Sequence, residues 1–332
     1  MRSSHPHLFR VSSLPVPALF PSVIDLLLVL MAVFWGANYS IVKNVFREID
    51  PQAFNGLRMS IASLIFLTVI LGVRARASGP DGTTAGSVFY TPAKMTARDW
   101  WALAGLGAVG HCSYQYCFMA GLSRTSVANS SLMLGVTPVL VALLSAMLGI
   151  DRIGRLHWVG AALSMAGIYL VVGTSFSLGS HGATGDLLMI AAVCCWAIYT
   201  IGAGPLMTRH SPVAVTGISM MMGTLMYLPL AWPSLRALRW NEITGSAWAA
   251  LIYSAVFALC ISYTIWYAGV RQLGSARTSI YSNFVPIVAM LTAVAVLHEP
   301  LGLRKILGAA AVLAGVGLTR LSSPKSVVPP QE

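Results

Sequence analysis

Long apolar runs alternate with short polar stretches along almost the whole chain. Ten of these runs predict membrane-spanning helices, because a helix needs roughly 20 mostly apolar residues to cross a bilayer. Their ranges are 24–42, 53–73, 100–120, 127–149, 157–174, 187–206, 213–232, 248–268, 279–297 and 306–320. The runs are too long and too continuously apolar for the alternating strands of a membrane β-barrel. The pattern therefore predicts an all-α integral membrane protein with ten transmembrane helices.

The apolar pattern repeats once along the chain. A shift of 161 residues aligns the start of the second half with the first, and a shift of 148 aligns the remainder. Aligned identities include Trp35 with Trp196, Pro51 with Pro212, Trp100 with Trp248, Pro138 with Pro286 and Gly167 with Gly315. Because each half has an odd number of helices, the second copy enters the membrane from the opposite side. The sequence therefore predicts two inverted five-helix repeats, an architecture that many secondary transporters use for alternating access.

These helices divide the chain into four parts. The parts are a cytoplasmic tail at 1–20, a first repeat at 21–174, a second repeat at 175–320 and a C-terminal tail at 321–332. With the N-terminus in the cytoplasm, 13 Lys and Arg fall on the inner side and 7 on the outer side, and Arg58 lies within a helix. The positive-inside rule then favours a multi-pass protein of the cytoplasmic (inner) cell membrane with both termini inside.

The composition predicts a lipid-facing surface. Only 9% of the 332 residues are charged, whereas soluble domains carry roughly 25%. The net charge of +11 comes from basic residues between the apolar runs, where they indicate topology and contacts with anionic lipid rather than nucleic-acid binding. The five cysteines lie in apolar segments without a Cys-x-x-Cys pair, which argues against a disulfide framework or a zinc site.

Signatures of catalysis are missing from the sequence. It contains no His-Glu-x-x-His, Gly-x-Ser-x-Gly or P-loop motif and no pair of acidic residues embedded in the membrane. An intramembrane enzyme needs such a buried base or metal set, so we expect neither an enzyme nor a cofactor or metal. A signalling membrane protein without transport is a further alternative, but a full set of ten helices without a soluble domain favours transport.

Aromatic and polar residues recur on one face of corresponding helices. In the first helix Trp35, Asn38 and Tyr39 have helical spacing, and Trp196 and Tyr199 occupy the matching places in the sixth. Lipid cannot satisfy polar groups, so such a face should meet protein or a cavity that binds an amphipathic or aromatic solute. The other candidates for this lining are Tyr114, Gln115, Phe118, Asn129, Ser130, Tyr263, Trp266, Tyr267, Tyr281 and Asn283. Core packing, interhelix hydrogen bonds and an interfacial aromatic belt are the alternatives.

Five further residues are candidates for movement or charge. Pro138 and Pro286 occupy equivalent mid-helix positions, and each should bend its helix as a hinge because it removes a backbone hydrogen bond. Arg58 either extends to the outer interface or binds an anionic group. His111 either packs or titrates, and His111 and Glu299 are the candidates for proton coupling. Facilitated flux is the alternative, because no carboxylate lies in the middle of a predicted helix.

Several stretches in the last two helices form a distinctive pattern. They are Pro286-Ile-Val-Ala-Met-Leu, Leu297-His-Glu-Pro-Leu-Gly302 and Gly308-Ala-Ala-Ala-Val-Leu-Ala-Gly315. Together they resemble the EamA-type domain of the drug/metabolite transporter superfamily, and Trp35-Gly-Ala-Asn38 looks like the start of a first such domain. The resemblance covers about 24–320 as two units. It implies ten helices, an inverted repeat and export of small molecules.

We therefore expect a secondary transporter that exports small metabolites, such as amino acids or similar amphipathic or aromatic solutes. The alternative on the same fold is a nucleotide-sugar or lipid-carrier translocator, which needs a cluster of cations facing the cavity to bind phosphate groups. The expected partners are the solute and membrane lipid, without nucleic acid. Ten helices can enclose a path alone, so a monomer suffices.

Overall fold

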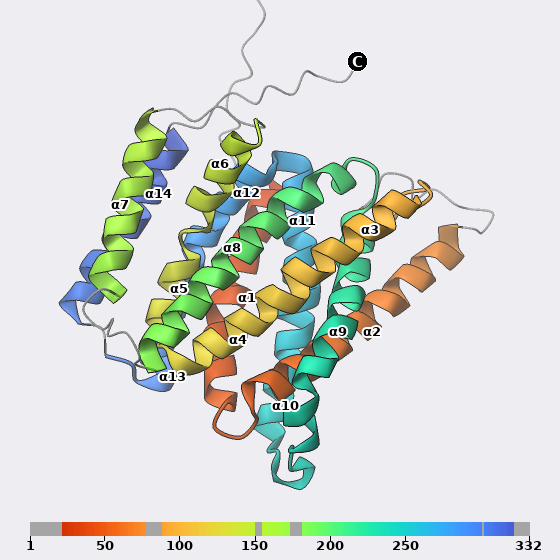
Figure 1. Cartoon of the computed structure of the whole chain (residues 1–332), viewed down its shortest axis with the longest axis horizontal. Coiled ribbons are helices and arrows are strands. Elements are labelled where there is room, and N and C mark those ends of the chain that lie inside the picture. Colours follow the sequence, from red (N-terminus) through yellow and green to blue (C-terminus); the bar gives the residue numbers. More distant parts are fainter. Residues whose placement is uncertain (1–21, 78–87, 150–154, 173–180, 301, 322–332) are drawn as a thin grey trace, which may run out of the picture.

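The computed structural model describes residues 22–77, 88–149, 155–172, 181–300 and 302–321. Within these ranges every regular element is a helix, and the helices pack side by side in one bundle (Figure 1). The predicted tails at 1–20 and 321–332 lie outside the described residues, except for Leu321. The prediction of an all-α protein is confirmed for the described part of the chain.

The elements follow one another without long irregular stretches in the described ranges. Those of the first half are α1 (Val23–Val45), α2 (Pro51–Ala77), α3 (Ala97–Leu106), η1 (Gly107–Ser113), α4 (Tyr114–Arg124), α5 (Val127–Leu134), α6 (Thr137–Met147) and α7 (Arg155–Val172). Those of the second half are α8 (His181–Met207), α9 (Pro212–Arg236), η2 (Trp240–Glu242), α10 (Gly245–Tyr253), η3 (Ser254–Ile261), α11 (Ser262–Leu273), α12 (Ser275–Ser279), η4 (Ile280–Asn283), α13 (Phe284–Leu297) and α14 (Leu303–Leu321).

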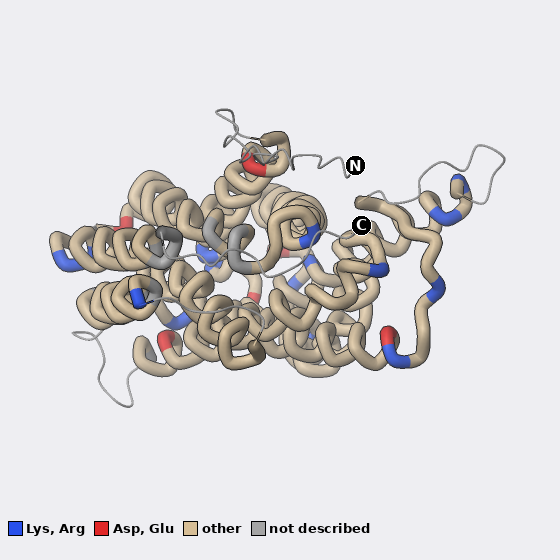
Figure 2. Tube along the Cα trace, turned by 90° about the horizontal axis from the view of Figure 1, so that it is seen from above, with Lys and Arg blue, Asp and Glu red and all other residues tan. Residues whose placement is uncertain are grey.

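Six helical stretches of the described chain are long and apolar enough to cross a membrane. They cover 23–45, 51–77, 127–147, 182–207, 212–236 and 245–273, and shorter apolar helices cover 158–167 and 281–297. The continuous stretch α3–η1–α4 is less apolar because it carries His111, Gln115 and two tyrosines. Large apolar side chains such as Leu64, Leu225 and Leu291 are exposed, and charged positions are sparse along the trace (Figure 2). A surface of this kind needs lipid as its solvent.

The α-helical geometry changes at equivalent places in two helices. The helix α3 passes into α4 through η1, and α10 passes into α11 through η3, and both connecting segments are π-helical. The shift of 148 residues places Gly107–Ser113 on residues 255–261, which make up nearly all of η3. Short π-helical segments inside α-helices are frequent at functional sites. The two copies therefore share a local irregularity that periodicity in the sequence does not reveal.

Helix breaks lie beside the two predicted hinge prolines. The helix α5 ends at Leu134 and α6 begins at Thr137, with Pro138 in its first turn. In the second half the 3-10 turn η4 precedes α13, and Pro286 lies in the first turn of α13. A first turn tolerates proline because its N–H groups have no intrahelical acceptors. Each proline thus begins a new helix next to a break, instead of bending one continuous helix.

Helices of the two halves pack against one another in matched pairs. The helix α7 lies along α14, α2 along α9, α4 along α8 and α11 along α1, while α6 contacts α8 as α13 contacts α1. A Cβ atom on Gly167 would stand 2.7 Å from the carbonyl oxygen of Gly308, and one on Gly315 would stand 2.5 Å from that of Gly160. Such small residues let membrane helices approach closely, because lipid tails provide no hydrophobic drive for association.

Replacing Gly315 with alanine should push α14 away from α7, because the carbonyl oxygen that the added Cβ meets belongs to the backbone. We expect this overpacking to lower stability by about 1–3 kcal/mol, and with it the melting temperature of the purified protein. Gly317→Ala in the same helix is the matched control, since nothing lies within 4 Å of its added Cβ and alanine favours a helix over glycine. Equal melting temperatures for the two variants would contradict this close helix contact.

Candidate functional site

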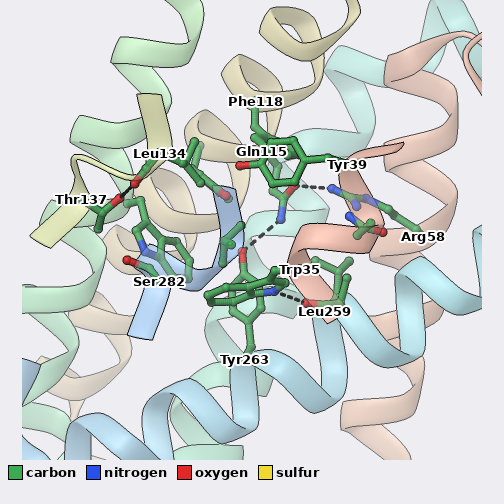
Figure 3. A pocket seen from close by; sticks show the side chains of 15 residues that line it. Trp35, Tyr39, Arg58, Gln115, Phe118, Leu134, Thr137, Leu259, Tyr263 and Ser282 are labelled. Carbon is green, nitrogen blue, oxygen red and sulfur yellow. Dashed lines mark hydrogen bonds between the residues drawn. The ribbon is translucent and has the colours of Figure 1, made fainter. Parts of the chain in front are cut away.

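A cavity lies between the two halves of the chain, and both halves contribute its wall (Figure 3). Nine residues singled out from the sequence line it: Trp35, Asn38, Tyr39, Arg58, Tyr114, Gln115, Phe118, Trp196 and Tyr263. The rest of the wall consists of Leu134, Thr137, Ala258, Leu259, Ser282 and Val285. These last residues are apolar or carry small hydroxyls, so their sequence context does not distinguish a cavity wall from ordinary helix packing.

Two tryptophans at equivalent repeat positions meet in this wall. The ring centroids of Trp35 and Trp196 are 5.5 Å apart, with the rings edge to face, which is a favourable arrangement for aromatic pairs. The indole N–H of Trp35 donates to the carbonyl oxygen of Ala258 in η3 at 2.9 Å. The Tyr263 ring packs 5.8 Å from Trp35 and 5.2 Å from Trp196. The two halves therefore touch through matching residues, one of which is fixed by a π-helical carbonyl.

The guanidinium of Arg58 forms the polar side of the cavity. Its Nε, Nη1 and Nη2 atoms donate to Asn55 Oδ1, Ser254 Oγ and Gln115 Oε1, each at 2.7 Å. Gln115 in turn donates through Nε2 to the hydroxyl of Tyr263 at 3.1 Å. Arg58 is 1% exposed, so its side chain points inward and does not extend to the outer interface. Among the described residues no carboxylate forms an ion pair with it.

A second polar cluster surrounds His111 behind the cavity wall. The Nε2 atom of His111 lies 2.7 Å from the Tyr199 hydroxyl and 3.2 Å from Ser219 Oγ, and these two oxygens are 3.1 Å apart. The ring of Tyr267 packs against that of Tyr199 at 5.2 Å. The ring of Trp266 lies 5.4 Å from Trp35. Of the predicted lining residues, Tyr199, Trp266 and Tyr267 therefore form a layer behind the wall.

The four remaining candidates are not among the residues that line the cavity. The hydroxyl of Ser130 donates to the carbonyl oxygen of Ser126 at the start of the same helix. The backbone N–H of Asn129 donates to the hydroxyl of Ser126. The hydroxyl of Tyr281 donates to Asp25 Oδ1 at 2.5 Å. Asn283 has a buried side-chain oxygen without a hydrogen-bond partner. Their substrate role stays a prediction. The hydrogen bond of Ser130 lies within its own helix, and that of Tyr281 joins two helices.

Glu299 holds the start of α5 from outside that helix. Its carboxylate accepts the backbone N–H groups of Val127 at 2.9 Å and Ala128 at 3.4 Å, which are otherwise without intrahelical acceptors. On the other side of the turn, Lys43 Nζ donates to the carbonyl oxygens of Leu122 and Thr125, each at 2.6 Å. A carboxylate at a helix N-terminus and an ammonium at a C-terminus both complement the helix dipole. The turn between α4 and α5 is thus fixed by one charge from each half of the chain.

The wall has the chemistry of a binding site for an amphipathic solute. The described residues of the lining combine aromatic rings with amides, hydroxyls and a single guanidinium, and none of them is a carboxylate, thiol or imidazole. In the described part of the chain no group of three His, Cys, Asp or Glu is placed to hold a metal ion. Such a wall can hold an amphipathic solute by its apolar faces and orient it by a few polar contacts.

The family comparison agrees with this geometry. The model of the EamA-like transporter family matches residues 22–173 and 183–321, so it matches the chain twice. This chain belongs to the EamA-like transporter family. The resemblance noted in the sequence is confirmed, and membership makes the protein a multi-pass membrane protein of a transporter family with a small-molecule cargo.

Relatives along nearly the whole chain carry transporter names. The uncharacterized transporter YyaM of Bacillus subtilis is 24% identical over 298 residues, which cover 88% of this chain and 92% of that protein. A probable terminal-alkyne amino-acid exporter of Streptantibioticus cattleyicolor is 25% identical over 293 residues, which cover 88% and 91%. A solved crystal structure has a TM-score of 0.63 at 17% identity and covers 90% of this chain and 97% of its own. At that identity the likeness shows the fold alone.

Replacing Glu299 with alanine should destabilise the protein, because two N–H groups at the start of α5 lose their acceptor. We expect a loss of about 0.5–2 kcal/mol, as for other helix caps, seen as a lower melting temperature. Glu242→Ala is the control, since its pair with Arg239 is exposed and contributes little. If Glu299→Ala instead kept the melting temperature and changed only pH-dependent transport, the capping role would be wrong and a proton-carrying role favoured.

Proposed function

We propose that this protein exports small metabolites across the cytoplasmic membrane as a secondary transporter with alternating access. Its cargo is an amino acid or a similar amphipathic, often aromatic, solute. The observation that carries this proposal is the cavity that both halves build around Trp35 and Trp196. A site at the interface of two repeats is the usual place for cargo in transporters of this design.

The helix packing supports a ten-span inverted repeat. Joining adjacent elements gives the spans α1, α2, α3–η1–α4, α5–α6, α7, α8, α9, α10–η3–α11, α12–η4–α13 and α14. When each span is replaced by its counterpart in the other half, the pairs α2–α9 and α7–α14 map onto themselves. The same replacement maps α4–α8 onto α11–α1 and α6–α8 onto α13–α1. A pseudo-two-fold axis between the repeats accounts for every one of these pairs. We propose that both termini face the cytoplasm, which the distribution of Lys and Arg favours.

The small size of the cavity supports a cycle in which its wall moves. The free space at its centre is about 40 Å³, which holds roughly three water molecules and no aromatic metabolite. Cargo therefore requires the wall to open. The helix breaks beside Pro138 and Pro286 occur at equivalent positions in the two halves, so either half can bend while the other stays straight, as alternating access requires.

The charge of the cavity favours a metabolite over a nucleotide sugar or a lipid-linked diphosphate. Several cations are needed to bind a diphosphate, whereas Arg58 is the one Lys or Arg among the described residues that line the cavity. His111 remains the candidate for proton coupling, because its ring lies 5.4 Å from that of the lining residue Tyr263. Facilitated flux is the alternative, and it needs no titrating group. The described residues that line the cavity come from one copy of the chain, so a monomer suffices for the proposed transport.

Liposomes that contain the protein and are loaded with a mixture of amino acids should release apolar or aromatic ones faster than protein-free liposomes loaded with the same mixture. Trp35→Ala should lower this flux by roughly tenfold, because it removes the contact between the halves and about 1.4 kcal/mol of aromatic interaction. Trp232→Ala is the matched control, since that side chain is 59% exposed on α9. Repeating the assay with and without a pH gradient tests coupling. Exchange of nucleotide-linked solutes without amino-acid flux would contradict the proposal and favour the alternative.

Pro286→Ala should slow transport several-fold while the amount of folded protein changes little. Alanine allows η4 and α13 to join into a regular helix, and the second half then loses its break. Initial flux and the yield of monodisperse protein are measured on the same preparations. Pro229→Ala is the control, because this proline lies inside α9 and away from the cavity wall. Equal losses of flux and yield in Pro286→Ala would make the proline structural only.

A further inference from the structure

We propose that Arg58 binds a carboxylate of the cargo and that Asn38 and Tyr39 bind the N–H donors beside it, so that the cavity selects zwitterionic amino acids with apolar side chains. This inference rests on the proposed transport function and names the chemistry of its cargo. It is carried by an unbalanced buried charge and by unpaired polar atoms that line the same small cavity (Figure 3).

The charge of Arg58 lacks a counter-ion in the described part of the chain. All three of its protein partners are neutral oxygens, from Asn55, Ser254 and Gln115. A guanidinium carries five N–H donors, so these partners leave two donors for another acceptor. A buried cation is stable only with hydrogen bonds and opposite charge, and three neutral acceptors supply the first without the second. An anion in the cavity supplies both.

Two buried polar atoms of the wall also lack partners. The side-chain oxygen of Asn38 and the hydroxyl of Tyr39 form no hydrogen bond with any described residue, and both residues line the cavity together with Arg58. A buried polar group without a hydrogen-bond partner destabilises the fold. Two such groups beside a cavity indicate a ligand that forms the missing hydrogen bonds. The amide oxygen of Asn38 only accepts, so its partner must donate. A cargo ammonium group has this chemistry.

The apolar part of the wall fits the remainder of such a cargo. The rings of Tyr114 and Phe118 stack at 5.7 Å, and Tyr114 packs against Trp196 at 5.1 Å. These rings and Trp35 offer faces and edges to an aromatic or branched aliphatic side chain. The cavity therefore has a cationic group, a hydrogen-bond acceptor and an aromatic surface, which match the carboxylate, the ammonium and the side chain of an apolar amino acid.

The two halves differ at the position of the charge. The shift of 161 residues places Arg58 on Ser219, whose hydroxyl bonds His111 and Tyr199 instead of facing the cavity. The two halves share their helix packing but differ in charge at this position, because only the first half places a cation there. One carboxylate-binding group per cavity fixes a single orientation of the cargo. It also explains why a dianionic or diphosphate cargo has no second binding group.

Four probes that share a benzyl side chain separate these contributions: L-phenylalanine, L-phenylalaninamide, 3-phenylpropionate and phenethylamine. Binding to the purified full-length protein is measured by quenching of tryptophan fluorescence. We expect the two probes without a carboxylate to bind about 10- to 100-fold more weakly than L-phenylalanine, as loss of a hydrogen bond to a charged group predicts. The affinity for 3-phenylpropionate should lie between that for L-phenylalanine and those for the two probes without a carboxylate, because 3-phenylpropionate keeps the carboxylate and loses the ammonium.

Variants then assign the contributions to residues. Arg58→Gln should bring the preference for L-phenylalanine over its amide close to one, and Arg58→Lys should restore part of it. Asn38→Leu should remove the preference for L-phenylalanine over 3-phenylpropionate. Arg236→Gln, at the end of α9 and away from the cavity wall, should leave all preferences unchanged. If Arg58→Gln does not fold, the four probes on the native protein and on Arg58→Lys still test the inference.

The inference is overturned if the native protein binds L-phenylalaninamide as tightly as L-phenylalanine, or if it binds none of the four probes. Flux of other solutes in liposomes would in either case leave the transport proposal standing. Absence of flux for every solute, with the carboxylate preference intact, would instead overturn transport and keep Arg58 as the group that binds a carboxylate.

Discussion

The fold depends on one constraint: lipid offers no hydrogen bonds, so every polar group at membrane depth must be satisfied by protein. The backbone meets this constraint by forming helices throughout the described spans. Where a helix departs from α-geometry, the exposed backbone is used, as when the indole of Trp35 donates to the Ala258 carbonyl in η3. The polar side chains gather inside for the same reason, and their meeting place is the cavity between the halves.

Two features of this interior combine stability with the capacity to move. The outer layers are held by close backbone approach, as at Gly315 against Gly160, and by charges such as Glu299 that cap a helix of the other half. The centre is held by an edge-to-face contact between the rings of Trp35 and Trp196, which involves side chains only. Helix breaks beside equivalent prolines lie next to this centre. We place the proposed rocking of one half against the other at this aromatic contact.

The sequence predicts the helical class and many of the residues found in the cavity wall. Both follow from the pattern of apolar and polar positions, because lipid cannot form hydrogen bonds. Lipid does not solvate a polar stripe such as Trp35, Asn38 and Tyr39, so this stripe in an apolar helix indicates an inward face. The wall residues Thr137 and Ala258 were missed, since small residues occur at every helix contact. Trp266 resembled a wall residue in spacing but lies behind the tryptophan pair, a difference of depth that periodicity cannot express. The cap formed by Glu299 depends on a contact 172 residues away in the chain, which no local signal encodes.

The most direct test of the account is the accessibility of one cavity residue from both sides of the membrane. Thr137→Cys, in a chain whose five native cysteines are replaced, places a nearly isosteric thiol in the wall. A membrane-impermeant thiol reagent is added to sealed vesicles of either orientation, with and without an apolar amino acid. Alternating access through this cavity predicts labelling from each side, with slower labelling when the amino acid is bound. Labelling from only one side under every condition would contradict alternating access through this cavity.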